Sequence, residues 1–271
     1  NIQVLDPYTG FATVKQFSVG NGSDPHDIAF LSRSRAFVTR YNEDQLWIVN
    51  TNSGQKTGQI DFSWLADADL IPEMDHLIRV GDRIFVSVER LDRNAALWPP
   101  VGDSYIAVFD AYTEQFVDAN PSQNGVQALR LVATNPFGEM VLNPATPVIW
   151  VPMTGRFGFL DGGLEVVNPA TLESRLVLTE SQLGGDITDV VPIDENRGVA
   201  IISDAAFNNL LVGIQGNVSL MLLNKAPDHR DIKYLKNIEK GVMHGAELTR
   251  QVLGFARGGK YEVPATDLNH L

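Results

Sequence analysis

Four stretches of the chain share one pattern, an apolar strand that stops at an aspartate or asparagine and runs into a tight turn. The stretches are residues 2–10, 46–54, 106–113 and 164–171, and the residues at the stop are Asp6, Asn50, Asp110 and Asn168. A short carboxylate or amide side chain at this place can accept a hydrogen bond from the backbone two residues on and so close the turn. Four copies of one pattern predict a repeat protein.

Three further strands accompany each copy. Alternating apolar runs at 36–39, 84–87 and 148–151 come before the second, third and fourth copies, and earlier runs lie at 27–30, 76–79 and 139–142. A last run follows the turn, as at 13–17 and 174–178. Four short antiparallel strands per unit are typical of a β-propeller blade.

The number of blades follows from this assignment. Whole blades are predicted near 25–61, 72–132 and 135–179, after the last two strands of another blade and before two strands at 188–193 and 197–202. These final strands could pair with the first two and close a small ring of four blades. The alternative, which we favour, is an open arc cut from a larger ring. We therefore expect a mainly β chain over residues 1–203, a partial or small β-propeller of about four blades.

Residues 36–42 and 46–50 resemble the YVTN-type propeller repeat, and the looser resemblance of the other units covers residues 1–203. The resemblance implies a fold rather than an activity. Members of that group are mostly surface or secreted bacterial proteins, which implies a compartment outside the cytoplasm.

The composition limits the partners. A net charge of −12 argues against nucleic acid and against an anionic membrane surface, because both need a basic face. The chain has no cysteine, which excludes disulfides, thiolate metal sites and a cysteine nucleophile. No apolar run reaches the ~20 residues that a membrane-spanning helix needs. We predict no cofactor.

A second part is expected at 204–271, where the apolar period changes from 2 to 3.6 and predicts an α-helical hairpin. Residues 207–211, 213–217, 245–251 and 253–257 resemble the dimerisation and phosphotransfer hairpin of sensor histidine kinases. The resemblance implies a homodimer through one helix face. That face comprises Leu210, Leu211, Ile214, Val218 and Met221. In the family a phospho-accepting histidine stands where this chain has Ala205, so we expect no phosphotransfer.

Six polar residues fall at the starts of the strands predicted to be innermost. They are His26, Asp27, Asp75, His76, Glu139 and Asp189. In a propeller such side chains crowd towards the central channel, where they could bind a ligand or a Ca²⁺ or Zn²⁺ ion. The alternative is that they cap strands and bond loop backbone. We assign no metal and no catalytic residue.

A long insertion at 89–100 lies between two strands of one blade. It either contacts a partner or folds its Trp98 back over the blade edge.

The function favoured by these features is a non-catalytic β-propeller binding or scaffold module fused to a degenerate kinase-type hairpin. Its partner would be a second copy, a protein or a small molecule. Two alternatives stay open. One is a fragment of a two-component sensor histidine kinase with a propeller sensor region, and the other is a metal-dependent, lactonase-like propeller hydrolase.

Overall fold

The structure is a computed structural model that describes residues 1–195 and 197–204, and the backbone of residues 209–214. Its strands form five antiparallel sheets. The first sheet pairs β1 (Ile2–Asp6) with β2 (Ala12–Phe17). The second contains β3 (Ile28–Ser32), β4 (Arg35–Val38), β5 (Gln45–Val49) and β6 (Lys56–Asp61). The third contains β7 (Met74–Val80), β8 (Arg83–Val88), β9 (Tyr105–Asp110) and β10 (Leu129–Arg130).

The fourth sheet contains β11 (Val141–Leu142), β12 (Ile149–Met153), β13 (Gly163–Asn168) and β14 (Glu173–Thr179). The fifth contains β15 (Asp186–Pro192), β16 (Gly198–Ser203) and β17 (Asn209–Ile214). The helices among the described residues are short: 3₁₀ turns at Pro7–Thr9 and Ser63–Leu65, and α1 at Glu180–Leu183. None of them is long and apolar enough to cross a membrane.

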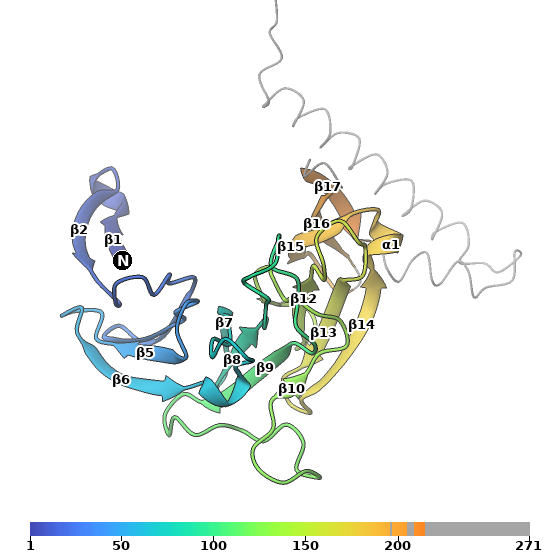
Figure 1. The fold of residues 1–271 in the computed structure, drawn as a ribbon. Helices are drawn as coiled ribbons and strands as arrows, with labels where there is room; N and C mark the ends of the chain where they lie inside the picture. Colours follow the sequence, from blue (N-terminus) through green and yellow to red (C-terminus); the bar gives the residue numbers. More distant parts are fainter. Residues whose placement is uncertain (196, 205–208, 215–271) are drawn as a thin grey trace, which may run out of the picture.

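The sheets are arranged as propeller blades. Within each full sheet the strands lie side by side in chain order, and the first strands of neighbouring sheets meet, β3 with β7, β7 with β11 and β11 with β15. The first strands therefore line the inner side of an arc, and the later strands fan outwards (Figure 1). The three whole blades of the arc match the three predicted from the sequence.

The repeated turn has the predicted chemistry. The Oδ1 atoms of Asp6, Asn50, Asp110 and Asn168 each accept a hydrogen bond from the backbone N–H two residues on, over 2.9–3.0 Å. The same short side chain thus ends the third strand of four successive blades.

The core is divided among the contacts between neighbouring sheets. One cluster of buried side chains fills each of the four contacts, and alternate residues of a strand face different clusters. In β8, for example, Ile84 and Val86 pack towards the preceding sheet and Phe85 packs towards the following one. Each such fully buried side chain contributes roughly 1.5–3 kcal/mol, so each blade is stabilised mainly by packing against the neighbouring sheets.

The arc is open, with β1 and β2 at one end and β15–β17 at the other (Figure 1). In a closed ring of four blades, β1 would pair with the outer edge of β16. That edge is instead taken by β17, whose Leu210 is opposite Ile202.

This strand corrects the predicted fold class. The α-helix expected from Phe207 onwards is wrong over Asn209–Ile214, which form β17. The apolar run 210–212 fits a buried strand as well as a helix, and the unpaired backbone of β16 favours the strand. Leu210, Leu211 and Ile214 therefore do not form the predicted helical dimerisation face. The other positions of that prediction, Ala205, Val218 and Met221 among them, lie outside the described residues.

Candidate functional site

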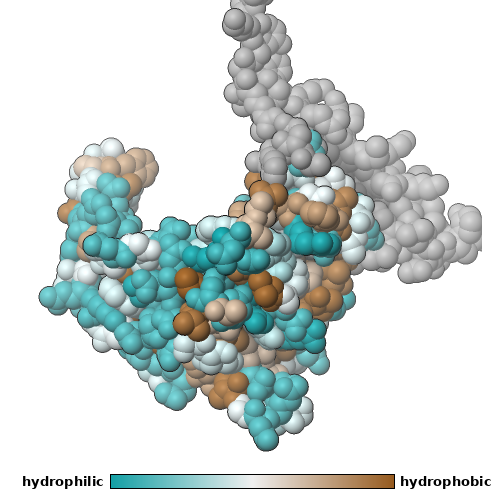
Figure 2. Space-filling view, viewed as in Figure 1, coloured by the Kyte–Doolittle hydropathy of each residue, from teal (hydrophilic) through white to brown (hydrophobic). Residues whose placement is uncertain are grey.

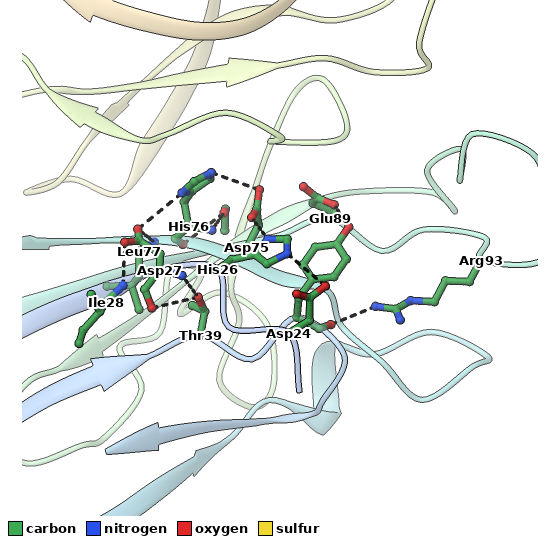
Figure 3. Close-up of polar contacts among 12 residues, drawn as sticks. Asp24, His26, Asp27, Ile28, Thr39, Asp75, His76, Leu77, Glu89 and Arg93 are labelled. Carbon is green, nitrogen blue, oxygen red and sulfur yellow. Dashed lines mark hydrogen bonds and ion pairs between the residues drawn. The ribbon is translucent and has the colours of Figure 1, made fainter. Parts of the chain in front are cut away.

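A cluster of aspartates and histidines lies where the inner strands β3 and β7 begin (Figure 3). Its centre is Asp75, whose side chain is 4% exposed. One oxygen of Asp75 is 2.5 Å from Nδ1 of His26, and the other is 3.5 Å from Nε2 of His76. Asp24 lies 3.6 Å from the second nitrogen of His26, and Asp27 lies 3.6 Å from the second nitrogen of His76. Each imidazole is therefore held between two carboxylates.

Asp27 also joins the two blades. Its Oδ1 accepts a hydrogen bond from the N–H of Ile28 at 2.7 Å, and its Oδ2 accepts one from the N–H of Leu77 at 3.0 Å. The hydroxyls of Thr39 and Ser87, at the ends of the second strands, accept from the N–H groups of Asp27 and His76. This network fixes the starts of β3 and β7 relative to each other.

The carboxylates make both histidines more basic. The hydrogen bond to Asp75 raises the pKa of His26 above its ordinary value, although burial opposes the shift. For His76, burial lowers the pKa, but the nearby carboxylates of Asp27 and Asp75 and the charge of Glu139 outweigh it. Burial raises the pKa of Asp27, and the nearby His76 together with hydrogen bonds from the N–H groups of Leu77 and Ile28 more than reverses that effect, so its pKa lies below the usual value.

A buried glutamate lies behind this cluster. Glu89 is fully buried and accepts a hydrogen bond from the hydroxyl of Tyr41 at 2.5 Å, and the Tyr41 ring stacks on His26 with centroids 4.2 Å apart. Burial and the charge of nearby Asp75 raise the pKa of Glu89 well above its usual value. Glu89 therefore holds its carboxyl proton at pH values where an exposed glutamate has lost it.

The insertion at 89–100 is tied to the neighbouring blade by Arg93. Its Nε donates to the fully buried Glu73 at 2.7 Å, and its terminal nitrogens donate to the carbonyl of Tyr41 at 3.0 Å and to Oδ1 of Asn42 at 2.7 Å. Burial raises the pKa of Glu73 to about 7 against the opposing effect of Arg93. The guanidinium lies 5.2 Å from the ring centroid of Trp98, which remains 42% exposed. The insertion thus folds over the cluster.

A pocket of about 380 Å³ opens between this insertion and the loops near residues 135 and 157. The residues lining it are Asp24, His26, Tyr41, Glu89, Leu91, Leu97, Trp98, Asn135, Phe137 and Phe157. Its polar groups come from the cluster and from Asn135, and the remaining walls are aliphatic and aromatic. Figure 2 shows apolar patches interrupting an otherwise largely hydrophilic surface on this face of the molecule.

Two buried oxygens of pocket-lining residues have no hydrogen-bond donor, Oε1 of Glu89 and Oδ1 of Asn135. The amide nitrogen of Asn135 is already used, since it donates to the carbonyl of Gly155 at 2.9 Å. A buried polar atom without a hydrogen-bond partner costs free energy, so a hydrogen-bond partner is expected for both oxygens.

Four of the six predicted site residues are brought together: His26, Asp27, Asp75 and His76. Glu139 is exposed and reaches the cluster only through its charge on His76. Asp189 lies in β15, where its Oδ1 accepts from the N–H of Val190 at 2.7 Å, as Asp27 does from Ile28. Within the part of the chain that the structure describes, no three histidine, aspartate or glutamate side chains are arranged to hold a metal ion.

Tyr41 and Glu89 were not predicted as site residues from the sequence, although their equivalent positions in two blades could have indicated them. Both stand two residues after the hydroxyl residue that ends a second strand, Thr39 and Ser87. Equivalent positions of neighbouring blades lie at the same end of a propeller, so the repeat itself could have placed them together.

No protein-family profile and no curated protein sequence matches the chain. Among solved structures, the hydrazine synthase of Kuenenia stuttgartiensis aligns at 12% identity over 74% of this chain and 49% of that one, with a TM-score of 0.49. A Bacteroides caccae protein of unknown function aligns at 13% identity over 77% of this chain and 64% of that one, with a TM-score of 0.45. The WD40 repeats of RRP9 align at 11% identity over 71% of this chain and 52% of that one, with a TM-score of 0.44.

The chain therefore spans about half of the first of these structures and less than two thirds of the second. At such TM-scores the propeller assignment rests on this chain's own strand order and inner-strand contacts. The resemblance of residues 205–271 to a kinase hairpin is not shown by these comparisons.

Proposed function

We propose that this chain is a non-catalytic β-propeller module that binds a small molecule in the pocket over the starts of β3 and β7. The observation that carries the proposal is the pocket itself, about 380 Å³ in volume, with apolar walls and two lining residues that keep a buried oxygen without a donor. This volume lies at the lower end of the usual range for small-molecule sites, roughly 300–1,000 Å³.

The polar groups of the cluster support binding rather than catalysis. The hydroxyl of Ser87 is fully buried and donates to the carbonyl of His76 at 3.2 Å. The two imidazoles lie between carboxylates, and the hydroxyl of Tyr41, whose ring stacks on His26, donates to Glu89 rather than to an imidazole. In this proposal the cluster of aspartates and histidines forms one rigid side of the pocket.

The test uses three probes of similar size and different charge: 2-phenylethylamine, 2-phenylethanol and 3-phenylpropanoate. Binding to the intact chain is measured by ligand-observed NMR and titration calorimetry. Trp98→Ala, which removes a wall of the pocket, should weaken the bound probe about tenfold or more, because aromatic anchors dominate such sites.

Trp64→Ala is the matched control. Trp64 is also 42% exposed but packs against Phe116, and it is not among the pocket-lining residues. It should leave binding unchanged. If none of the three probes binds, or if both tryptophan variants lose binding equally, the pocket is not the ligand site.

A further inference from the structure

We propose that the ligand is an organic ammonium ion with an apolar body, its N–H groups directed at Glu89 and Asn135 and its body against the aromatic wall. This inference rests on the proposed binding function and adds the chemical class of the ligand.

Two buried oxygen atoms at the pocket have no hydrogen-bond partner. They are Oε1 of Glu89 and Oδ1 of Asn135. Asn135 Oδ1 is an acceptor, and Glu89 Oε1 is one in the carboxylate form. They belong to different parts of the arc: Glu89 directly follows β8, and Asn135 lies between β10 and β11. A ligand that completes both must carry N–H or O–H donors, and an ammonium group carries several on one atom.

The charges of the residues that line the pocket favour some donor groups of a ligand over others. Asp24, His26 and Glu89 line the pocket, and no lysine or arginine does so. His26 lies between the carboxylates of Asp24 and Asp75, which balance its charge when it is protonated, and Arg93 is paired with Glu73 at 2.7 Å. A cation is therefore favoured over a neutral donor, and an anion is disfavoured.

The wall suits an organic cation. Trp98, Phe137 and Phe157 line the pocket, and the rings of Phe137 and Phe157 meet edge to face with centroids 5.3 Å apart. Aromatic faces attract cations as well as apolar groups. One face of Tyr41 already stacks on His26, and Arg93 lies 5.3 Å from the Tyr41 centroid and 5.2 Å from that of Trp98, so a cation already lies against the aromatic groups of this wall.

The ionisable groups around Glu89 make the affinity for the ammonium ion depend on pH. The groups that act on Glu89 are Asp75 and Glu73 from β7 and the residue before it, and Tyr41 from the loop after β4. Asp75 in turn binds His26. A bound ammonium ion stabilises the carboxylate form of Glu89 and so releases its proton. It also disfavours protonated His26. Both effects make the affinity for a cation rise with pH.

The experiment is titration calorimetry with 2-phenylethylamine and its neutral isostere 2-phenylethanol at pH 6 and pH 8. The amine remains protonated at both values, as lysine does. It should bind the intact chain at least about tenfold more tightly than the alcohol at pH 8, the factor expected for one retained charge pair. The preference should shrink at pH 6, and repeating the titration in buffers of different ionisation enthalpy should show proton release.

Glu89→Gln should abolish most of the preference for the amine and leave the alcohol within about twofold. Glu180→Gln makes the same change at a fully buried glutamate outside the pocket, and it should alter neither affinity. Because Glu89→Gln changes a fully buried carboxyl group and could unfold the chain, Asp24→Asn is a second test variant. The Asp24 side chain is 58% exposed, so this variant should fold and lose about two- to threefold in amine affinity.

The outcomes separate the two proposals. Equal affinity for amine and alcohol, a preference for 3-phenylpropanoate, or an amine affinity that neither variant lowers would overturn the ammonium assignment and leave the binding pocket in place. Failure of all three probes would instead overturn the binding function from which the assignment starts.

Discussion

Two contacts between blades bury carboxyl groups in different ways. Where the sheet β3–β6 meets β7–β10, here the first junction, the buried acids Glu73, Asp75 and Glu89 face side chains that themselves titrate or carry charge. Where β11–β14 meets β15–β17, the second junction, Glu180 accepts from the N–H groups of Gly162 and Ile187, both at 2.8 Å.

The backbone also approaches more closely in the second junction. The hydroxyl of Thr154 donates to the carbonyl of Ile187 at 2.6 Å, and a Cβ atom on Gly138 would lie 2.3 Å from the carbonyl oxygen of Thr188. Backbone donors have no protonation state to change, whereas histidines and carboxyls do. Glu180 itself titrates but its backbone partners do not, so the first junction has more groups that can respond to pH and to a charged ligand.

The largest effect is expected from Arg93→Met in the first junction. This change leaves Glu73 buried without its cation and removes the hydrogen bonds to Tyr41 and Asn42, so we expect a loss of about 3 kcal/mol in unfolding free energy. Urea denaturation at pH 8 measures it. Arg197→Met, which removes a surface pair with Asp194, is the control and should cost about 1 kcal/mol or less. Equal losses would show that the Glu73–Arg93 pair is no more important than a surface bridge.

The next effect is the pH dependence of stability. Burial raises the pKa of Glu73 and of Glu180 to about 7 from 4.5, so the folded chain keeps protons that the unfolded chain releases. The melting temperature should therefore fall as the pH rises from about 4.5 to about 7. His26 and His76, with pKa values raised above 6.5, extend the fall above that pH, and they belong to the first junction alone.

Thermal melts from pH 4.5 to 8.5 check this dependence. Glu180→Gln should flatten only the lower part of the profile, and His26→Asn should flatten only the upper part. A melting temperature that rises steadily across the range would contradict the assignment of the shifts.

The smallest effect is expected from Ile187→Val in the second junction. Ile187 is fully buried, and removing one methylene should cost about 1 kcal/mol, with the pH profile of the intact chain retained. Ile193→Val makes the same change at a residue that is 56% exposed and should cost less than about 0.5 kcal/mol. A change in the upper part of the pH profile, where His26 and His76 of the first junction titrate, would show that the two junctions are not independent.

The sequence predicted the blades because their signals are local. Asp6, Asn50, Asp110 and Asn168 recur at strand ends, and their side chains bond the backbone two residues on, wherever the blade lies in the arc. The strand at 209–214 was missed because its apolar residues also fit a helix, and the edge of β16 that decides the matter is a tertiary feature.

The site was predicted in part for the same reason. His26, Asp27, Asp75 and His76 lie at strand starts that the repeat places side by side. Arg93 reaches the cluster from an insertion that only one blade has, and no repeat pattern can place it. Asn135 is held with φ of 58° in a loop, and its role depends on the pocket around it.

The burial of β1 and β2 differs from that of the inner strands in a way that affects local stability. No residue of these two strands is buried, whereas most of β8 and β9 is. In stacked repeats each unit is stabilised chiefly by its neighbours, and among the described residues the sheet of β1 and β2 packs against the sheet β3–β6. Its local opening therefore requires less free energy than opening the sheet β7–β10. The sheet β3–β6 packs against both, and Asp24, His26 and Tyr41 beside its strands line the pocket, so opening at β1 and β2 reaches the pocket through that sheet.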